Sequence, residues 1–203
     1  MTKNKNNIPF PSLKGRVRAG LRCPWSGEDP LMIEYHDKEW GKPLHDDRGL
    51  FEFLILESFQ AGLSWRTVLH KRENLRKAFA NFDAKKVSKF DKKKFNSLIN
   101  DAGIIRNRLK IEAAINNAKC FLQLQKEFGS FDKYVWSFTN GKTIVNKPKS
   151  LKDLPAKTKI SDEMSEDMGK RGFKFRGSTI CYAFMQAVGI VDDHLVGCNC
   201  KGK

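Results

Sequence analysis

The longest apolar run of the chain, LFEFLILESF at residues 50–59, lies between clear helix signals. Acidic residues precede it in DDRG, as is typical of a helix N-terminus, and Gly62 follows it where helices often end in a left-handed residue. The run is shorter than the roughly 18 residues that a membrane span needs, and two glutamates interrupt it. The sequence therefore predicts a helix over 46–62 in a soluble fold, with no membrane partner.

Helical spacing of apolar residues recurs along most of the chain. A polar, lysine-rich loop with two prolines interrupts it at 140–159. Strand signals are few, so we expect an all-α fold without internal repeats. The further predicted helices cover 64–82 with Ser64 as N-cap, two segments within 92–129, and then 131–138, 161–172 and 177–189.

The charge of the chain is strongly positive. Lys and Arg outnumber Asp and Glu by 38 to 23, a formal net charge of +15. This excess indicates a polyanionic partner, and nucleic acid fits better than an anionic membrane because no amphipathic segment carries a basic face. A merely solvated lysine surface is the alternative. We interpret residues 1–21, poor in large apolar side chains, as a flexible basic arm before a helical domain at 22–203.

Five cysteines at irregular spacing, without a secretory signal, indicate thiols or metal ligands and a cytoplasmic location. His194 and Cys198 form a close pair near one end of the chain, and Cys23 and His36 form a looser pair near the other. Four such ligands are typical of a closed, structural zinc site, which would join the two ends of the fold. Cys200 competes with Cys198 as a ligand, and ordinary packing is the alternative. The remaining two cysteines lie on apolar helical faces and are expected in the core.

The stretch DAGIIRNRLK joins two predicted helices by a short turn that contains a glycine. Glycine lets the backbone approach a ligand closely, and the N–H groups at the start of the second helix form an anion site. Arginines and Lys110 add positive charge to the same place. The pattern predicts a helix-hairpin-helix around 92–118 that binds a DNA phosphate without reading base sequence, with an ordinary helical turn as the alternative. Its expected DNA contacts are Gly103, Ile104, Arg106 and Arg108.

Glu57 lies near the end of the long apolar helix, where its neighbours are apolar on almost all sides. A carboxylate in that setting either reaches solvent at the helix end or faces a sheltered cavity. Trp25, Tyr35 and Trp65 occur in short aromatic clusters. Aromatic rings with one anion suit a flat, positively charged ring, through stacking and cation–π attraction. Core packing is the alternative for the tryptophans, and for Trp40 it is the interpretation that we adopt.

Six motifs together resemble the bacterial DNA-3-methyladenine glycosylase I family. In chain order, from about residue 22 to 200, they are DPLMIEYHDKEWGKP, LESFQAGLSWRTVL, DAGIIRNR, VWSF, KRGFKFRGSTICYAFMQAVG and DHLVGC. The resemblance implies a helix-hairpin-helix glycosylase fold. It implies a monofunctional enzyme of base-excision repair, which hydrolyses the N-glycosidic bond of 3-methyladenine in double-stranded alkylated DNA and leaves an abasic site. The zinc ligands that it implies are Cys23, His36, His194 and Cys198.

The resemblance also assigns roles around the base. It implies that Glu57, Tyr35 and Trp65 shape the pocket with Trp25 close by, and that a wedge enters the DNA gap. Met32 stands where relatives often carry an aromatic residue. Gly62 and Leu63 resemble the family's wedge.

Glu57 is the catalytic group that we expect, because methylation at N3 leaves adenine cationic and its bond to the sugar weak. The carboxyl group would accept hydrogen bonds from the exocyclic amine and offset the charge of the base. No lysine is placed as a Schiff-base nucleophile, so lyase activity is not expected. We expect a monomer. The rival interpretations are a zinc-stabilised DNA-binding module without catalysis and a glycosylase for another lesion, such as 7-methylguanine or hypoxanthine.

Overall fold

The computed structural model describes residues 22–202, so the predicted arm at 1–21 lies outside the described residues. The described part is mostly helical, with one pair of very short strands. Its α-helices are α1 (Pro30–Lys38), α2 (Asp47–Gln60), α3 (Trp65–His70), α4 (Arg72–Ala78), α5 (Ala84–Val87), α6 (Lys92–Asn100), α7 (Arg108–Phe128), α8 (Phe131–Ser137), α9 (Lys159–Lys170) and α10 (Ser178–Ala187). The 3-10 helices are η1 (Pro24–Ser26), η2 (Ala80–Phe82) and η3 (Leu151–Asp153), and the strands are β1 (Ile144–Val145) and β2 (Val191–Asp192).

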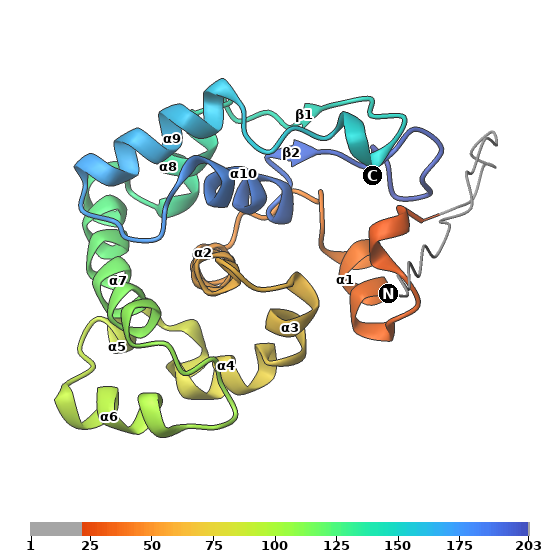
Figure 1. Cartoon of the computed structure of the whole chain (residues 1–203). Coiled ribbons are helices and arrows are strands. Elements are labelled where there is room, and N and C mark those ends of the chain that lie inside the picture. The colour runs from red at the N-terminus through yellow and green to blue at the C-terminus, as the bar shows by residue number, and fades with distance from the viewer. Residues whose placement is uncertain (1–21, 203) are drawn as a thin grey trace, which may run out of the picture.

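Helix α2 is the centre of the core. Every residue from Leu50 to Phe59 is buried, and the helix contacts α3, α7, α8 and α10. Figure 1 views α2 along its axis, with these helices around it. Asp46 caps its first turn by accepting the N–H of Gly49 at 2.8 Å, and Gly62, just beyond its end, has φ +76°. The predicted helix over 46–62 is therefore confirmed, since an all-round apolar helix is stable only where others cover it.

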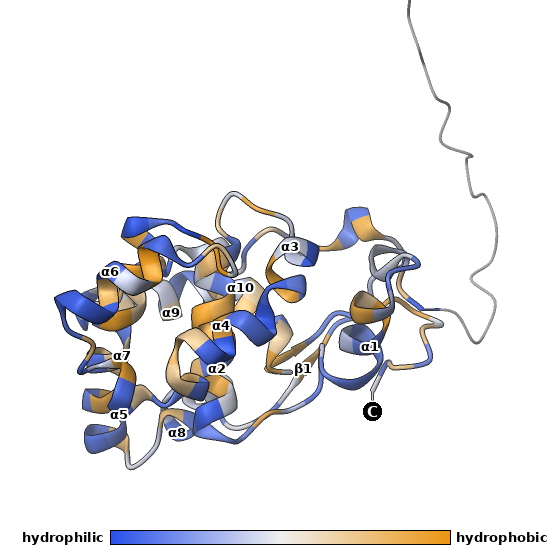
Figure 2. Cartoon of the chain, turned by 90° about the horizontal axis from the view of Figure 1, so that it is seen from below, coloured by the Kyte–Doolittle hydropathy of each residue, from blue (hydrophilic) through white to orange (hydrophobic). Residues whose placement is uncertain are grey.

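Helices α3, α7, α8 and α10 pack against α2, and α5 and α6 pack in turn against α7. Figure 2 shows hydrophilic and hydrophobic residues alternating along α6 and α7, as in amphipathic helices. None of the helices within residues 22–202 is both long and apolar enough to cross a membrane.

The start and the end of the described chain lie side by side (Figure 1). The N–H of Leu195 donates to Sγ of Cys23 at 3.4 Å. The strands β1 and β2 pair in parallel, with Ile144 opposite Val191, and this ties the 140–159 segment to the C-terminal segment. The two cysteine-containing ends of the chain are thus brought together by the fold.

Two parts of the helical prediction differ from the structure. The predicted helix over 64–82 is broken at Lys71 into α3 and α4 and ends in η2, where Asn81 has φ 55°. Lys71 donates from Nζ to the carbonyl of Gly103 at 3.1 Å, so a contact distant in sequence coincides with the break. The predicted polar loop at 140–159 contains β1 and η3.

Candidate active site and metal cluster

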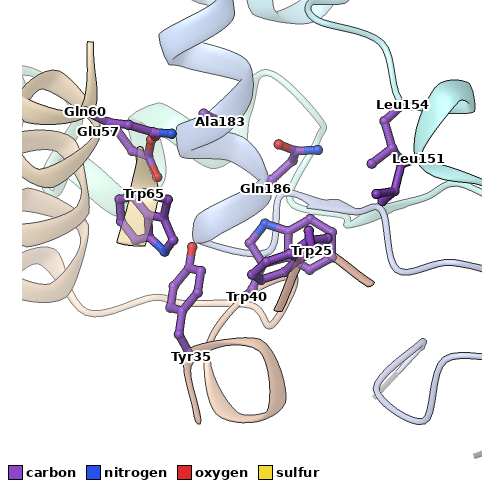
Figure 3. A pocket seen from close by; sticks show the side chains of 10 residues that line it. All are labelled: Trp25, Tyr35, Trp40, Glu57, Gln60, Trp65, Leu151, Leu154, Ala183 and Gln186. Carbon is purple, nitrogen blue, oxygen red and sulfur yellow. The ribbon is translucent and has the colours of Figure 1, made fainter. Parts of the chain in front are cut away.

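A cavity of about 260 Å³ opens beside the last turn of α2. It lies between helices that are far apart in sequence, and Figure 3 shows side chains from both sides pointing into it. Its lining is mainly aromatic and apolar, with one carboxyl group, Glu57, among the described residues. The lining residues are Trp25, Tyr35, Trp40, Glu57, Gln60, Trp65, Leu151, Leu154, Ala183 and Gln186.

The carboxyl group of Glu57 is sheltered from solvent. The residue is 4% exposed, and its Oε2 is buried without a hydrogen-bond partner. Burial alone raises the pKa of Glu57 from 4.5 to about 8. Of the two expected outcomes, helix-end exposure or a sheltered cavity, the structure gives the second. An isolated buried carboxyl group with a raised pKa is typical of functional sites.

Aromatic rings form one wall of the cavity. The ring centroids of Tyr35 and Trp65 are 5.0 Å apart, and those of Trp25 and Trp40 are 4.9 Å apart. Trp40 is buried, as core packing predicts, and it also lines the cavity. Burial, with the nearby Glu57, raises the pKa of Tyr35 well above its ordinary value, so its hydroxyl group keeps its proton.

Met32 is buried, but it borders a neighbouring cavity and not the one around Glu57. The thioether therefore takes no direct part in the wall that faces the carboxyl group in this structure.

Within residues 22–202, four buried side-chain polar atoms have no hydrogen-bond partner. Three of them belong to residues that line the cavity: Nε1 of Trp25, Nε1 of Trp65 and Oε2 of Glu57. Leaving such atoms unpaired costs about 1 to 3 kcal/mol each, so their gathering in one place calls for an explanation. Two donors and one acceptor in an aromatic setting suit a flat, polar ring.

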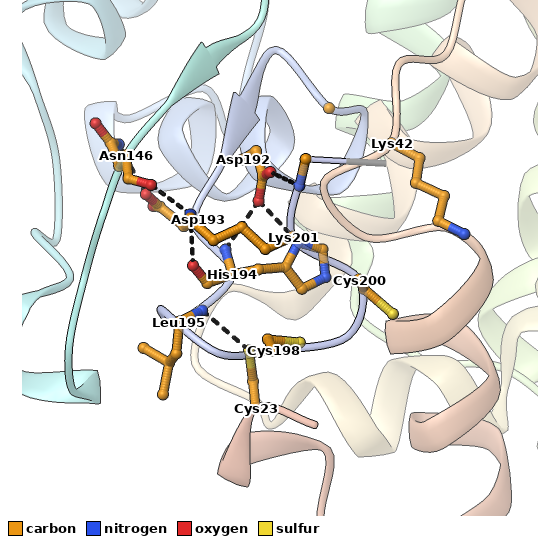
Figure 4. A network of polar contacts seen from close by, with 12 residues as sticks. Cys23, Lys42, Asn146, Asp192, Asp193, His194, Leu195, Cys198, Cys200 and Lys201 are labelled. Atoms are coloured by element: carbon orange, nitrogen blue, oxygen red, sulfur yellow. Dashed lines mark hydrogen bonds and ion pairs between the residues drawn. The ribbon is translucent and has the colours of Figure 1, made fainter. Parts of the chain in front are cut away.

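The fourth unpaired atom, Nε2 of His194, belongs to a second cluster. Ligand atoms of His36, His194, Cys198 and Cys200 all lie within 4.8 Å of one another, and all four residues are buried. Figure 4 shows the thiols of Cys23, Cys198 and Cys200 near the ring of His194. Three of the four predicted ligands are therefore brought together, with Cys200 in the group.

Cys23, the fourth predicted ligand, lies beside this group. It is 1% exposed, and burial raises the pKa of its thiol to about 12, with a smaller contribution from the adjacent Cys198. Its own N–H donates to Nε2 of His36 at 3.2 Å. Cys23 thus lies at the cluster, where Cys198 and Cys200, the two thiols that compete in the sequence, are both present.

Two carboxylates orient the histidines of the cluster. Nδ1 of His36 is 2.8 Å from Oδ1 of Asp37, and Nδ1 of His194 is 2.8 Å from Oδ1 of Asp192. A ring whose Nδ1 donates to a carboxylate offers the lone pair of Nε2 to a metal. With a buried Nε2 that lacks a partner and thiols beside it, the donor set fits a zinc ion.

The predicted hairpin lies between α6 and α7. The carbonyl of Gly103 accepts hydrogen bonds from Lys71 and from Nδ2 of Asn74, each at 3.1 Å, which holds the turn against α4. Arg106 and Arg108 are exposed, whereas the side chain of Ile104 is buried. Arg108 pairs loosely with Glu112, at 3.7 Å, and lies over the ring of Phe95. Both arginines remain accessible to an anionic partner, whereas Ile104 can offer only its backbone.

The sequence suggested that Lys110 adds charge to the hairpin surface, but in the structure its side chain points inward. It is 5% exposed, and its Nζ donates to the carbonyls of Phe59 and Ala61 at 2.7 and 2.6 Å. The ammonium group therefore caps the end of α2 from within. Next to this cap, Gly62 and Leu63 are exposed, in the segment between Gln60 and Trp65, which both line the cavity.

Residues 25–201 match the methyladenine glycosylase family. This chain belongs to the methyladenine glycosylase family. The DNA-3-methyladenine glycosylase of Haemophilus influenzae is 51% identical over 180 residues, which cover 89% of this chain and 97% of that relative. A crystal structure of 3-methyladenine DNA glycosylase I is 48% identical with a TM-score of 0.87, and the match covers 89% of this chain and 100% of that one. A variant crystallised in complex with 3-methyladenine is 36% identical with a TM-score of 0.87, covering 90% and 98%.

Membership of the methyladenine glycosylase family confirms the resemblance. The matched residues contain the whole lining of the cavity, while Cys23 precedes them. Sequence reasoning missed Gln60 and Gln186 in the lining, and it missed the carboxylates that orient the cluster histidines. The spacing of Ala183 and Gln186, one turn apart on a predicted helix, was the available signal.

Proposed function

We propose that this chain is a DNA glycosylase of base-excision repair that hydrolyses the N-glycosidic bond of 3-methyladenine in alkylated DNA. The products are the free base and an abasic site. The observation that carries the proposal is the unpaired, buried carboxyl group of Glu57 in an aromatic cavity, in a chain whose relatives are named for this activity. A structural relative crystallised with 3-methyladenine supports the identity of the base.

The chemistry follows from the charge of the lesion. Methylation at N3 gives adenine a positive charge and weakens its bond to the sugar, so the leaving group is activated beforehand. Before a base enters, the raised pKa, about 8, keeps Glu57 protonated at neutral pH. An entering cation favours the ionised carboxylate, because opposite charges at close range lower the pKa of an acid. Base entry is therefore coupled to loss of a proton from Glu57.

Tyr35 and Trp65 are proposed to hold the extruded base, with Trp25 completing the pocket. Extrusion from the duplex breaks the stacking of the base on its neighbours, and stacking on these aromatic rings replaces it. Relative to a neutral purine such as hypoxanthine, a cationic purine gains the attraction of the carboxylate. This difference accounts for selectivity toward 3-methyladenine.

The duplex is proposed to lie across the hairpin and the mouth of the pocket. The exposed Arg106 and Arg108 suit phosphates, with the backbone of Gly103 and Ile104 beside them. Gly62 and Leu63 are proposed as the wedge. Leu63 is an apolar side chain that is 41% exposed to water, so burying it between DNA bases would be favourable. The domain at 22–203 would act as a monomer on double-stranded DNA.

The cluster of histidines and cysteines at the joined chain ends is proposed to hold one structural zinc ion. Cys23, His36, His194 and Cys198 are the proposed ligands, and Cys200 is near enough to compete. The ion would join the two ends of the domain and so hold η1 and α1, which carry Trp25 and Tyr35, against the C-terminal segment.

The test of function uses purified protein and DNA treated with a methylating agent. We expect release of free 3-methyladenine, identified by chromatography, and cleavable abasic sites in the same DNA. Glu57→Gln keeps the size of the side chain but cannot ionise, and we expect it to lose most excision. Glu52→Gln is the matched control on the same helix, since Glu52 pairs with Arg72 and Arg76 outside the cavity. Full excision by Glu57→Gln would refute the assigned role.

A further inference from the structure

Gln186 is a polar side chain in the lining of the cavity. It lies in the last turn of α10, and Figure 3 shows it on the other side of the cavity from Glu57. Ala183, one turn earlier, also lines the cavity, and its small side chain leaves the space before Gln186 open. Gln186 is half-buried and therefore accessible to a bound base.

The side-chain amide of Gln186 is held by a buried carboxylate. Asp193 is 1% exposed, and its Oδ2 accepts from Nε2 of Gln186 at 2.7 Å and from the hydroxyl of Tyr182 at 2.6 Å. Its Oδ1 accepts from Nδ2 of Asn146 at 2.7 Å. Burial, with the contact to Asp193, raises the pKa of Tyr182, so the hydroxyl stays a donor.

This network fixes which end of the amide faces the cavity. Nε2 of Gln186 lies 2.7 Å from Oδ2 of Asp193, so Gln186 turns its NH₂ group toward that carboxyl group. A flipped amide would place its carbonyl oxygen against Oδ2 of Asp193, which already accepts from the hydroxyl of Tyr182, and the hydrogen bond from Gln186 would be lost. The carbonyl oxygen Oε1 therefore faces the side of the cavity where Glu57 lies (Figure 3).

We propose that Gln186 is a specificity-determining residue, whose Oε1 accepts a hydrogen bond from the exocyclic amine of the damaged adenine. Asp193 is the positioning residue that holds Oε1 in that orientation. This inference rests on the proposed function. The amine carries two N–H groups, so acceptance by Gln186 leaves one for Glu57.

The consequence is discrimination between two cations of equal charge. Guanine methylated at the same ring nitrogen carries a carbonyl oxygen where adenine carries its amine. That oxygen would face Oε1 of Gln186, and two acceptors that face each other gain no hydrogen bond and repel. The charge of Glu57 attracts both bases, and each hydrogen bond from the amine, to Glu57 and to Gln186, favours an amino purine over an oxo purine.

The experiment uses DNA methylated so that it contains both 3-methyladenine and 3-methylguanine. Release of each base is followed with wild type and with Gln186→Met, which keeps the length of the side chain and removes the acceptor. We expect the rate for 3-methyladenine to fall about tenfold, the loss of one hydrogen bond, while the rate for 3-methylguanine changes about twofold or less. The ratio of the two rates thus falls at least about fivefold.

Two further variants separate orientation from packing. Gln125→Met is the matched control, because Gln125 donates to Oδ2 of Asp47 at 2.6 Å in the same way but outside this cavity. We expect it to keep the wild-type ratio. Asp193→Asn can present an NH₂ group in place of an oxygen, so the amide of Gln186 is free to flip, and we expect the ratio to fall although Gln186 is intact. Zinc content is measured alongside, because His194 is adjacent. An unchanged ratio in Asp193→Asn would overturn its positioning role.

Proportional losses of both bases in Gln186→Met would overturn the inference, because the residue would then only fill space. A measurement on wild type alone covers the case in which the variants do not fold. Free 3-methyladenine should inhibit excision more strongly than free 3-methylguanine, and equal inhibition would also overturn the inference. A wild type that releases neither base refutes the proposed function. A wild type that releases 3-methyladenine, with an unchanged ratio in Gln186→Met, refutes this inference alone.

Discussion

Glu57→Gln is expected to make the protein more stable while it removes activity, and the gain is expected to grow with pH. The carboxyl group is buried and its Oε2 lacks a partner, so ionising it in the folded chain is unfavourable. Glutamine fills the same space without a titratable group. The substitution therefore removes the unfavourable free energy of ionising a buried acid, a stability cost that the active site carries for its function.

The magnitude follows from the pKa of Glu57, which is 4.5 in the ordinary case and about 8 in the fold. Between these values the unfolded chain has released a proton that the folded chain still holds. Stability from this group is hence fully present below pH 4.5 and falls as the pH rises toward 8. At about 1.4 kcal/mol for each pH unit, the loss is below about 1 kcal/mol at pH 5, about 3 at pH 7 and about 4 at pH 8.

The assay is urea unfolding of both proteins at pH 5, 7 and 8, followed by tryptophan fluorescence. We expect the difference in unfolding free energy between Glu57→Gln and wild type to rise by about 3 kcal/mol across this range. Glu52→Gln, on the same helix, should have the opposite sign at pH 7, because it breaks the pairs of Glu52 with Arg72 at 2.6 Å and Arg76 at 2.7 Å.

A difference between Glu57→Gln and wild type that stays the same from pH 5 to pH 8 would refute the reasoning. It would mean that water reaches the carboxyl group and that its pKa is ordinary. The proposed coupling between base entry and proton release would then lose its basis.

Three other predictions concern the rest of the molecule. Wild type should contain one equivalent of zinc by elemental analysis, and Cys198→Ser should lose it and melt at a lower temperature; a full equivalent in the variant would point to Cys200 as its replacement. The double change Arg106→Ala and Arg108→Ala should lower the slope of log affinity for duplex DNA against log salt by about 2, one for each phosphate contact, as measured by fluorescence anisotropy. The exposed pair Lys85→Ala and Lys86→Ala on α5 serves as its control, and an equal change there would count against the hairpin. Lys110→Met should lower the unfolding free energy in urea by about 1 to 3 kcal/mol, because it leaves the carbonyls of Phe59 and Ala61 without their donor; a neutral effect would show that water replaces the ammonium group.

Local patterns were sufficient for much of the fold. The apolar run in α2, its acidic start and Gly62 predicted a buried helix, because these signals act within a few residues. The break at Lys71 was not predictable in this way. It coincides with a hydrogen bond from Lys71 to Gly103, a partner 32 residues away, which periodicity cannot reveal.

The site shows the same division. Residue types predicted an acid among aromatic rings and a cluster of thiols and imidazoles, and family motifs pointed to the individual residues. Sequence could not show that Lys110 turns inward to the end of α2, because a lysine among arginines looks like surface charge. It also could not choose between Cys198 and Cys200, since both reach the same space once the chain ends meet.

The sequence by itself determined the helical class, the basic charge, the family and the kinds of chemical group in the site, because each of these depends on composition, local periodicity or motif. Only the tertiary structure decided that Glu57 is buried without a partner and that Asp193 fixes the amide of Gln186. Desolvation and hydrogen-bond direction depend on which distant segments pack around a group, and no local pattern records that.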